Sequence, residues 1–318
     1  MIRVAYSGEP GAFAEDAVVA YFAASETAPL PGFRDVFEAV QAGRGPADPR
    51  GDVSVVVDAP VVAARIAGVA GAEGVAPIAA GVVPIENLVN GTVRENYDLL
   101  LEHDLVVRGE VVVPVQLCLA ALPGASIDGI ERVYSHIQAL GQADRFLRGR
   151  PWQLLSTYNT AAAGRAIADR DERGAAAVLS PRAARLAGLE ILADGIQSVP
   201  DNRTRFLVVT RPDAALSDGE LREPLAVQAA ARGMRTTVVM GVRNEPGTLL
   251  RCLSILADER MNMSKLESRP SLERAWEYVF WVDLDADAGA PATQRALERL
   301  ADATTLLRVL GSYPRAEA

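Results

Sequence analysis

The sequence predicts an α/β protein of two or three domains. Its 318 residues are enough to bury a sizeable core, and 49% of them are hydrophobic while 23% are charged. Up to residue 210, strand-like and helix-like segments alternate, which is typical of α/β units on largely parallel sheets. After a turn-rich connector at residues 211–233, the order becomes βαββαβ, which indicates a small ferredoxin-like module.

Apolar spacing places the elements of the first part. Strand-like apolar segments predict strands at Ile2–Tyr6, Val53–Val57, Gly81–Ile85, Glu110–Leu122, Val133–Ser135, Ala175–Ser180 and Phe206–Thr210. Helical spacing predicts helices at Ala14–Phe22, Val93–His103, Ile137–Arg148, Thr160–Asp169 and Pro181–Ala187. Residues 45–80 are rich in Gly, Ala and Pro and exceed the usual length of a loop, so we expect a surface insertion there.

The C-terminal part begins after the connector. Strands are expected at Arg235–Val242, Lys265–Ser268, Ala275–Asp283 and Leu306–Leu310, and helices at Pro246–Glu259 and Thr293–Ala303. We therefore expect a first domain at 1–210, a linker at 211–233 and a second domain at 234–318.

Composition excludes several classes of function. A net charge of −9 argues against nucleic acid or an anionic membrane as partner, and the apolar runs are too short to span a bilayer. The N-terminus reads as a strand and not as a signal peptide, so a cytoplasmic protein is expected. Cys118 and Cys252 lie far apart in apolar segments and favour two buried thiols over a disulfide. With only His103 and His136 and no Cys/His cluster, a structural zinc site is not expected.

Polar clusters at the ends of two expected strands point to a ligand crevice. The segment 202–209 (Asn-Arg-Thr-Arg-Phe-Leu-Val-Val) brings the hydroxyl of Thr204, the guanidinium of Arg205 and the ring of Phe206 to the mouth of a strand. Glu86 and Asn87 end another strand in Pro-Ile-Glu-Asn.

Three further polar turns precede expected helices. They are Ser-Gly-Glu-Pro-Gly at 7–11, Ser-His-Ile-Gln at 135–138 and Asn-Thr at 159–160. Glycines and a helix N-terminus suit an anion, although a tight connector explains the first turn equally well. Ser135 and Asn159 could equally be simple helix caps. No aspartate completes a triad with Ser135 and His136, so acyl transfer is not expected.

In their order and spacing these motifs resemble the prephenate dehydratase family over nearly the whole chain. The resemblance implies a two-lobed, periplasmic-binding-protein-like catalytic domain followed by a ferredoxin-like ACT regulatory domain. Prephenate loses CO2 and water together and becomes aromatic, so the reaction requires no cofactor or metal. A hydrogen-bond donor is needed at the departing hydroxyl.

The resemblance also implies roles for individual residues. Thr204 matches the family's essential threonine and is expected to serve the leaving oxygen, with Glu86 and Asn87 as further catalytic residues. Arg205 is a candidate for gripping a carboxylate, or alternatively a structural partner of Glu86. Phe206 packs beside the substrate ring or in the core. The other expected substrate contacts are Gly11, Ser135, His136, Gln138, Asn159 and Thr160.

The C-terminal module resembles a phenylalanine-sensing ACT domain. The match rests on the turn at 244–249 and on Glu-Ser-Arg-Pro at 267–270. L-Phenylalanine is therefore the expected effector, and its expected contacts are Asn244, Pro246, Gly247, Thr248, Leu249, Glu267, Ser268, Arg269 and Pro270. ACT modules usually pair across subunits, which implies a homodimer or homotetramer.

Three departures from the family pattern keep other functions open. Ala14 and Leu88 stand where relatives carry hydroxyl residues, and Ile137 replaces a proline. A catalytically inactive amino-acid sensor is one alternative. Arogenate dehydratase, which performs the same chemistry on the aminated substrate, is another. Thr204 and the ACT-like module argue against a non-aromatising prephenate decarboxylase.

Overall fold

The computed structural model of the chain describes residues 1–43, 77–270 and 278–316. The strand expected at residues 53–57 and most of the expected insertion at 45–80 lie outside the described residues.

The first lobe is built on a mixed six-stranded sheet in the order β2-β1-β3-β11-β5, with the short β4 paired to β3. Its strands are β1 (Ile2–Ser7), β2 (Ser25–Leu30), β3 (Ala80–Asn87), β4 (Gly91–Thr92), β5 (Val106–Pro114) and β11 (Arg203–Thr210), and its helices are α1 (Phe13–Tyr21), α2 (Phe33–Ala42) and α4 (Arg94–Glu102). Side chains of α1 join the core on one face of the sheet, and those of α2 and α4 join the core on the other.

The second lobe carries a five-stranded sheet in the order β10-β6-β9-β7-β8. Its strands are β6 (Cys118–Ala121), β7 (Arg132–His136), β8 (Gln153–Thr157), β9 (Ala175–Leu179) and β10 (Glu190–Ala193), and its helices are α5 (Ile137–Gln142), α6 (Asp144–Leu147), α7 (Thr160–Asp169) and α8 (Pro181–Leu186), with a single 3-10 turn at Ile127–Gly129. Cys118 is buried in this lobe, where its thiol lies 3.4 Å from the Leu179 carbonyl oxygen.

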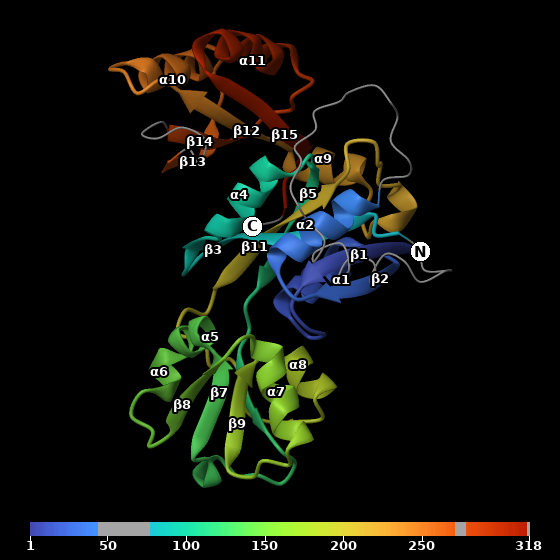
Figure 1. Cartoon of the computed structure of the whole chain (residues 1–318), viewed down its shortest axis with the longest axis vertical. Helices are drawn as coiled ribbons and strands as arrows, with labels where there is room; N and C mark the ends of the chain where they lie inside the picture. The colour runs from blue at the N-terminus through green and yellow to red at the C-terminus, as the bar shows by residue number, and fades with distance from the viewer. Residues whose placement is uncertain (44–76, 271–277, 317–318) are drawn as a thin grey trace, which may run out of the picture.

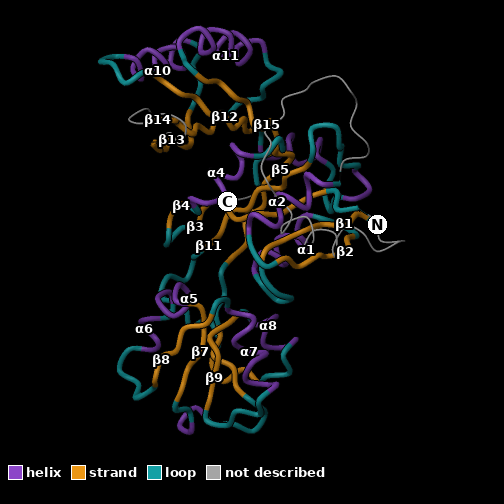
Figure 2. The backbone as a smooth tube through the Cα atoms, viewed as in Figure 1, coloured by secondary structure: helices purple, strands orange, loops and turns teal. Residues whose placement is uncertain are grey.

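The expectation of largely parallel sheets is wrong for both lobes. In the first lobe β1 pairs in parallel with β2 and β3, but β11 runs antiparallel to both β3 and β5. In the second lobe β7 is parallel to β8 and β9, whereas β6 is antiparallel to β9 and β10. The reason is that the chain crosses between the lobes after β5 and returns before β11 (Figure 2), which brings strands of opposite direction into each sheet.

The first crossing interrupts the apolar run at residues 110–122 that was expected to be continuous. β5 ends at Pro114 and β6 begins at Cys118, so the run contributes to two different sheets. At the break, the backbone N–H of Val115 donates to the carbonyl of Asn202 (2.8 Å), which lies on the returning crossing. The two crossings are thus hydrogen-bonded side by side at the point where the lobes meet.

The C-terminal domain confirms the predicted βαββαβ order. It consists of β12 (Met234–Val242), α10 (Thr248–Asp258), β13 (Met263–Pro270), β14 (Tyr278–Leu284), α11 (Pro291–Ala303) and β15 (Leu306–Pro314) in an antiparallel sheet of order β13-β14-β12-β15. The connector is not only turns, because it contains a 3-10 turn at Asp218–Glu220 and the helix α9 (Leu225–Arg232).

The three bodies are stacked, with the first lobe between the other two (Figure 1). α10 and α11 cover the outer face of the C-terminal sheet, and the inner face lies on the first lobe. Val239, Trp281 and Tyr313 of that inner face belong to the same core cluster as α2 and α4. The rings of Trp281 and Tyr97 meet edge to face, with centroids 4.5 Å apart, so the contact is an apolar interface and not only a polar one.

Among the residues described, none of the helices has the length and apolar character needed to cross a membrane.

Candidate active site

Thr204 and Asn87 form the centre of the candidate site. They lie opposite each other on the antiparallel pair β11 and β3, next to the crossing between the lobes. The amide Nδ2 of Asn87 donates to Thr204 Oγ1 at 2.9 Å. None of the described residues accepts a hydrogen bond from the Thr204 hydroxyl. The hydroxyl therefore receives a hydrogen bond and keeps its own hydrogen for another acceptor.

The orientation of the Asn87 side chain is fixed by the backbone. Its Oδ1 accepts from the N–H groups of Val89 (3.0 Å) and Asn90 (2.9 Å), so the NH2 end must face Thr204. The same NH2 group lies 3.0 Å from Asn202 Oδ1 and 3.1 Å from the Arg203 carbonyl. Its two hydrogens are shared among three acceptors, which holds the amide in one place.

Asn202 begins the segment at 202–209 but was not among the expected site residues. It is 1% exposed, and its own Nδ2 has no partner among the described residues. The amide side chain two residues before Thr204 was the signal available in the sequence. Asn202 accepts from the Asn87 amide that also donates to Thr204, so its effect on Thr204 passes through Asn87.

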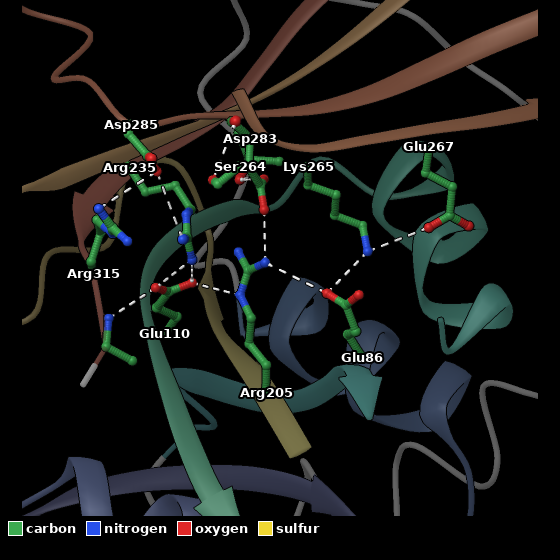
Figure 3. Close-up of polar contacts among 12 residues, drawn as sticks. Glu86, Glu110, Arg205, Arg235, Ser264, Lys265, Glu267, Asp283, Asp285 and Arg315 are labelled. Carbon is green, nitrogen blue, oxygen red and sulfur yellow. Dashed lines mark hydrogen bonds and ion pairs between the residues drawn. The ribbon is translucent and has the colours of Figure 1, made fainter. Parts of the chain in front are cut away.

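Glu86 and Arg205 are not brought to this cluster. Successive side chains of a strand point to opposite faces, so the neighbours of Asn87 and Thr204 lie on the face covered by the C-terminal domain. Figure 3 shows both side chains pointing toward that domain. The alternative that Arg205 is a structural partner of Glu86 agrees with this placement, although their closest N–O distance is a long 4.0 Å.

Arg205 is the centre of a buried ion cluster between the domains (Figure 3). Its guanidinium contacts Glu110 of β5 at 2.6 Å and Asp283 of β14 at 2.7 Å, and Glu110 in turn binds Arg235 of β12 at 2.6 Å. Burial opposes the charge of Arg205, but interactions with Tyr313, Asp283 and Glu110 outweigh burial and raise its pKa above the ordinary value. With these partners, the guanidinium is committed to docking the C-terminal domain.

Phe206 lies on the same face of β11 as Thr204, but its ring does not reach a cavity. It is 2% exposed and lies in the core on the α1 face of the first lobe. Of the two places expected for this ring, the structure shows the core.

The Gly-rich turn before α1 joins the two lobes. The N–H of Gly11 donates to Glu15 (2.7 Å), and its carbonyl accepts from the hydroxyl of Ser180 in the second lobe (3.0 Å). Gly11 has φ +92°, and a Cβ there would lie 2.8 Å from the Cα of Ala183, so only glycine allows this approach. Both polar groups of the Gly11 backbone are thus used within the protein, and its expected role as an anion donor has no free N–H.

Ion pairs reinforce this contact. Glu9 accepts from the hydroxyl of Tyr158 and lies 3.2 Å from Arg165, both of the second lobe. Arg182 of α8 pairs with Glu15 (3.2 Å) and Asp16 (3.0 Å) of α1. The structure therefore shows the two lobes held together on this side of the crossing.

The second lobe presents the other expected substrate contacts at the ends of β7 and β8. Ser135 is fully buried and donates to the carbonyl of Val178 (2.5 Å), so its hydroxyl supports the sheet. His136, and not Ser135, caps α5 by accepting from the N–H of Gln138 (3.3 Å). The side chain of Gln138 is exposed.

Asn159 caps a helix, which is one of the two roles expected for it; the other was a substrate contact. Its Oδ1 accepts from the N–H of Ala162 (2.6 Å) at the start of α7, while its Nδ2 is buried without a partner among the described residues. Thr160, the first residue of α7, is half-buried beside it. The three departures from the family pattern differ in exposure, since Ala14 is buried while Leu88 and Ile137 are 67% and 64% exposed.

The C-terminal domain carries a pocket of about 200 Å³ at the turn between β12 and α10. Of the expected phenylalanine contacts it includes Asn244, Gly247, Thr248 and Leu249, together with Tyr278 and Phe280 of β14, which the sequence had not indicated as ligands. Pro246 does not line it. No residue of Glu267–Pro270 does so either: Glu267 accepts from Thr92 (2.6 Å), and Arg269 pairs with Asp98 (2.9 Å), both in the first lobe.

Comparison with known proteins gives the family. The prephenate dehydratase family model matches residues 60–214, and the ACT domain model matches residues 236–302. Chloroplastic arogenate dehydratase 5 of Arabidopsis thaliana is 35% identical over 331 residues, covering 98% of this chain and 67% of the plant protein.

Two solved structures share the whole fold at 26% sequence identity. The prephenate dehydratase of Arthrobacter aurescens in complex with L-Phe has a TM-score of 0.75 and covers 100% of this chain and 90% of its own. GqqA, described as a novel type of quorum quenching acylase, has a TM-score of 0.76 and covers 98% of each chain. The two matched domains, the plant relative and the shared fold show that this chain belongs to the prephenate dehydratase family.

Proposed function

We propose that the chain converts prephenate to phenylpyruvate, CO2 and water. The observation that carries this proposal is the Asn87–Thr204 hydrogen bond, in which the amide donates and leaves the threonine hydrogen free. As the ring carboxylate leaves as CO2, the electron pair of its bond to the ring forms the new ring double bond. The ring hydroxyl departs as hydroxide, which takes a proton from solvent to become water. A donor already oriented toward the departing oxygen stabilises the charge that develops there.

Thr204 acts as a hydrogen-bond donor to the leaving oxygen and not as a strong acid. The Asn87 amide draws electron density from the Thr204 oxygen, which strengthens the hydroxyl as a donor. The reaction uses no oxidant or reductant, because the electrons released by decarboxylation are those that aromatise the ring. Residues of the second lobe near His136, Asn159 and Thr160 are the candidates for holding the carboxylates.

Fold alone does not choose among reactions, since a quorum quenching acylase shares this architecture. Arogenate differs from prephenate by an amino group in place of the keto oxygen of the side chain. Both substrates need the same donor at the ring hydroxyl, so the Thr204 cluster fits either one.

Parallel assays test the proposal. Purified protein is supplied with prephenate or with arogenate, and phenylpyruvate or phenylalanine is measured. We expect phenylpyruvate from prephenate with the higher kcat/KM. A higher kcat/KM for arogenate would reassign the substrate, and product from neither would leave the inactive sensor as the remaining reading.

We also propose that phenylalanine binds the pocket at 244–249 and inhibits the enzyme. The pocket of about 200 Å³ has room for one amino acid, and a relative 26% identical was solved with L-Phe. Gly247 has φ +85°, which a β-branched residue adopts only with strain. We expect calorimetry to show phenylalanine binding that Gly247→Val abolishes. Wild-type protein that binds no phenylalanine at millimolar concentration would make the domain purely structural.

A paired arrangement of C-terminal domains, in a homodimer or homotetramer, accompanies this proposal. Light scattering on the eluted protein checks it, and a monomeric mass at micromolar protein would contradict it.

A further inference from the structure

Lys265 is the only lysine in the sequence, and the other 31 basic residues are arginines. It lies on β13 with its side chain 12% exposed, at the interface between the C-terminal domain and the first lobe. Its ammonium is 3.0 Å from Glu86 and 3.4 Å from Glu267, and it lies 5.5 Å from the ring centroid of Tyr97 (Figure 3 shows the two carboxylates). One cation therefore joins a catalytic-domain strand to the C-terminal domain.

The chemistry of this position suits lysine better than arginine. An ammonium is a compact point charge with three donors, whereas a guanidinium is a planar fork that matches one carboxylate side-on. Lys265 has two carboxylates and an aromatic face around one nitrogen, which is a convergent arrangement. A chain that otherwise uses arginine throughout has its one lysine where a compact cation fits.

The partners of Lys265 connect it to the β3–β4 hairpin, which carries Asn87. Glu86 pairs in register with Thr92 of β4, and the hydroxyl of Thr92 donates to the same Glu267 carboxylate at 2.6 Å. β13 thus holds both strands of the β3–β4 hairpin at one level. Asn87, the next residue after Glu86, points to the opposite face and holds Thr204.

The tip of this hairpin is free to respond to a shift at its base. Residues 88–91 are exposed, and the Leu88 N–H bond to the Arg203 carbonyl (2.9 Å) joins the tip to the strand of Thr204. A segment with few buried contacts opens at low free energy. Movement of β13 would therefore reach Asn87 through Glu86 without a change in the lobes.

We propose that Lys265 is a positioning residue, through which the C-terminal domain sets the place of Glu86 and Asn87 and transmits phenylalanine binding to the active site. This inference rests on the proposed function for the identity of substrate and effector. Lys265 does not line the pocket at 244–249, so its role is separate from phenylalanine binding itself.

Substitution of Lys265 separates coupling from binding. Lys265→Met keeps the unbranched apolar stem of the side chain and removes the ammonium group. We expect the phenylalanine concentration for half-inhibition to rise at least tenfold, while calorimetry still shows phenylalanine bound at unchanged stoichiometry. Lys265→Arg keeps a positive charge and should restore part of the inhibition. A folded Lys265→Met protein that is inhibited like the wild type overturns the inference.

A matched control crosses the same interface elsewhere. Arg308 of β15 donates to the carbonyls of Leu101 (3.1 Å) and His103 (2.8 Å) at the end of α4 and does not contact β3. Arg308→Met should leave the half-inhibiting phenylalanine concentration within about threefold of the wild-type value, because Arg308 docks the domain on the end of α4 and not on the β3–β4 hairpin. Equal loss of inhibition in both variants would assign the effect to general docking and would overturn a specific role for Lys265.

A single lysine also gives a readout that needs no turnover. Protein labelled with ζ-15N-lysine contains one side-chain ammonium signal, which is assigned without ambiguity. We expect Glu86→Gln to shift this signal, and phenylalanine to shift it in the wild type. A signal that is insensitive to Glu86→Gln rules out the contact. Absence of prephenate turnover in wild-type protein would instead contradict the proposed function and leave the lysine test to stand on its own.

Discussion

The two faces of the β3–β11 pair differ in chemistry although they are made by neighbouring residues. On the α1 face, Asn87 and Thr204 are uncharged and joined by one hydrogen bond of 2.9 Å. On the other face, Glu86 and Arg205 belong to ionic contacts with the C-terminal domain. One strand pair therefore carries the proposed reaction on one side and domain docking on the other.

This difference gives each side of the motif a separate task. A neutral amide and a hydroxyl can direct hydrogen bonds to an anionic substrate without neutralising or repelling it. The ionic face does not meet the substrate, so charged groups can be used there. Glu110 and Asp283 are each 3% exposed and contact Arg205 on the side opposite to Thr204. Substitutions on the two faces should therefore affect different measurements.

The largest expected effect is on stability, from Arg205→Met. Removing the guanidinium leaves Glu110 and Asp283 with fewer charge partners in a buried site, and breaking a buried pair typically lowers stability by about 3–5 kcal/mol. Arg235 and Thr237 remain as partners, which favours the lower end of that range. Denaturant unfolding measures the change. The exposed pair of Arg299 and Asp258 provides the control, because Arg299→Met should change stability by less than about 1 kcal/mol.

Thr204→Ala should act on rate and not on stability. Loss of one preorganised donor typically lowers kcat by about 10²–10³-fold. Thr204→Ser keeps the hydroxyl and should retain more activity. Near-normal turnover by folded Thr204→Ala protein would remove Thr204 from the mechanism.

Asn202→Leu should have a smaller effect on the same face. It removes the acceptor that helps to hold the Asn87 amide, and one hydrogen bond contributes about 0.5–1.5 kcal/mol. We expect kcat to fall by up to about tenfold with little change in KM. Asn202→Asp keeps the acceptor and should preserve more of kcat, while its charge should raise KM for an anionic substrate. Equal kcat in all three proteins would exclude a role for Asn202.

The smallest effect concerns pH and the ionic face. Burial works to raise the pKa of Asp285, but hydrogen bonds from Asn262 and Ser264 and the charges of Arg315 and Arg235 outweigh it and lower the pKa. A depressed folded-state pKa gives stability that is present above the unfolded value of about 3.9 and is lost as pH falls through the folded value. Asp285→Asn should lower stability by less than about 1 kcal/mol at pH 7. The difference from wild type should shrink as the pH falls through the folded-state pKa of Asp285. A difference that persists in acid would contradict this assignment.

The sequence predicted buried strands well and missed three edge strands of the two lobes. Apolar spacing located β1, β3, β9 and β12 within one or two residues, because their side chains face a core. β2, β8 and β10 were not predicted, and each is the edge strand of its sheet with many half-exposed residues. An edge strand lacks the apolar pattern on which such a prediction depends.

The sequence predicted which residue types form the candidate site better than it predicted the face of the sheet on which each side chain lies. Strand alternation implied that Thr204 and Arg205 face opposite ways, but which face the C-terminal domain covers depends on tertiary packing. Glu110 offered a signal, since a lone carboxylate in the apolar run at 106–115 needs a buried partner. Its partners Arg205 and Arg235 lie 95 and 125 residues along the chain, and no local pattern joins them to Glu110.

Hydrogen exchange with and without phenylalanine tests most directly whether the two faces communicate. We expect phenylalanine to change exchange in the pocket segment at 242–250 and also in residues 86–92, which lie between Lys265 and Thr204. Lys265→Met should keep the first change and lose the second. A change confined to 242–250 in the wild-type enzyme, together with full inhibition by phenylalanine, would show that control reaches the active site by another route and would exclude communication through Lys265.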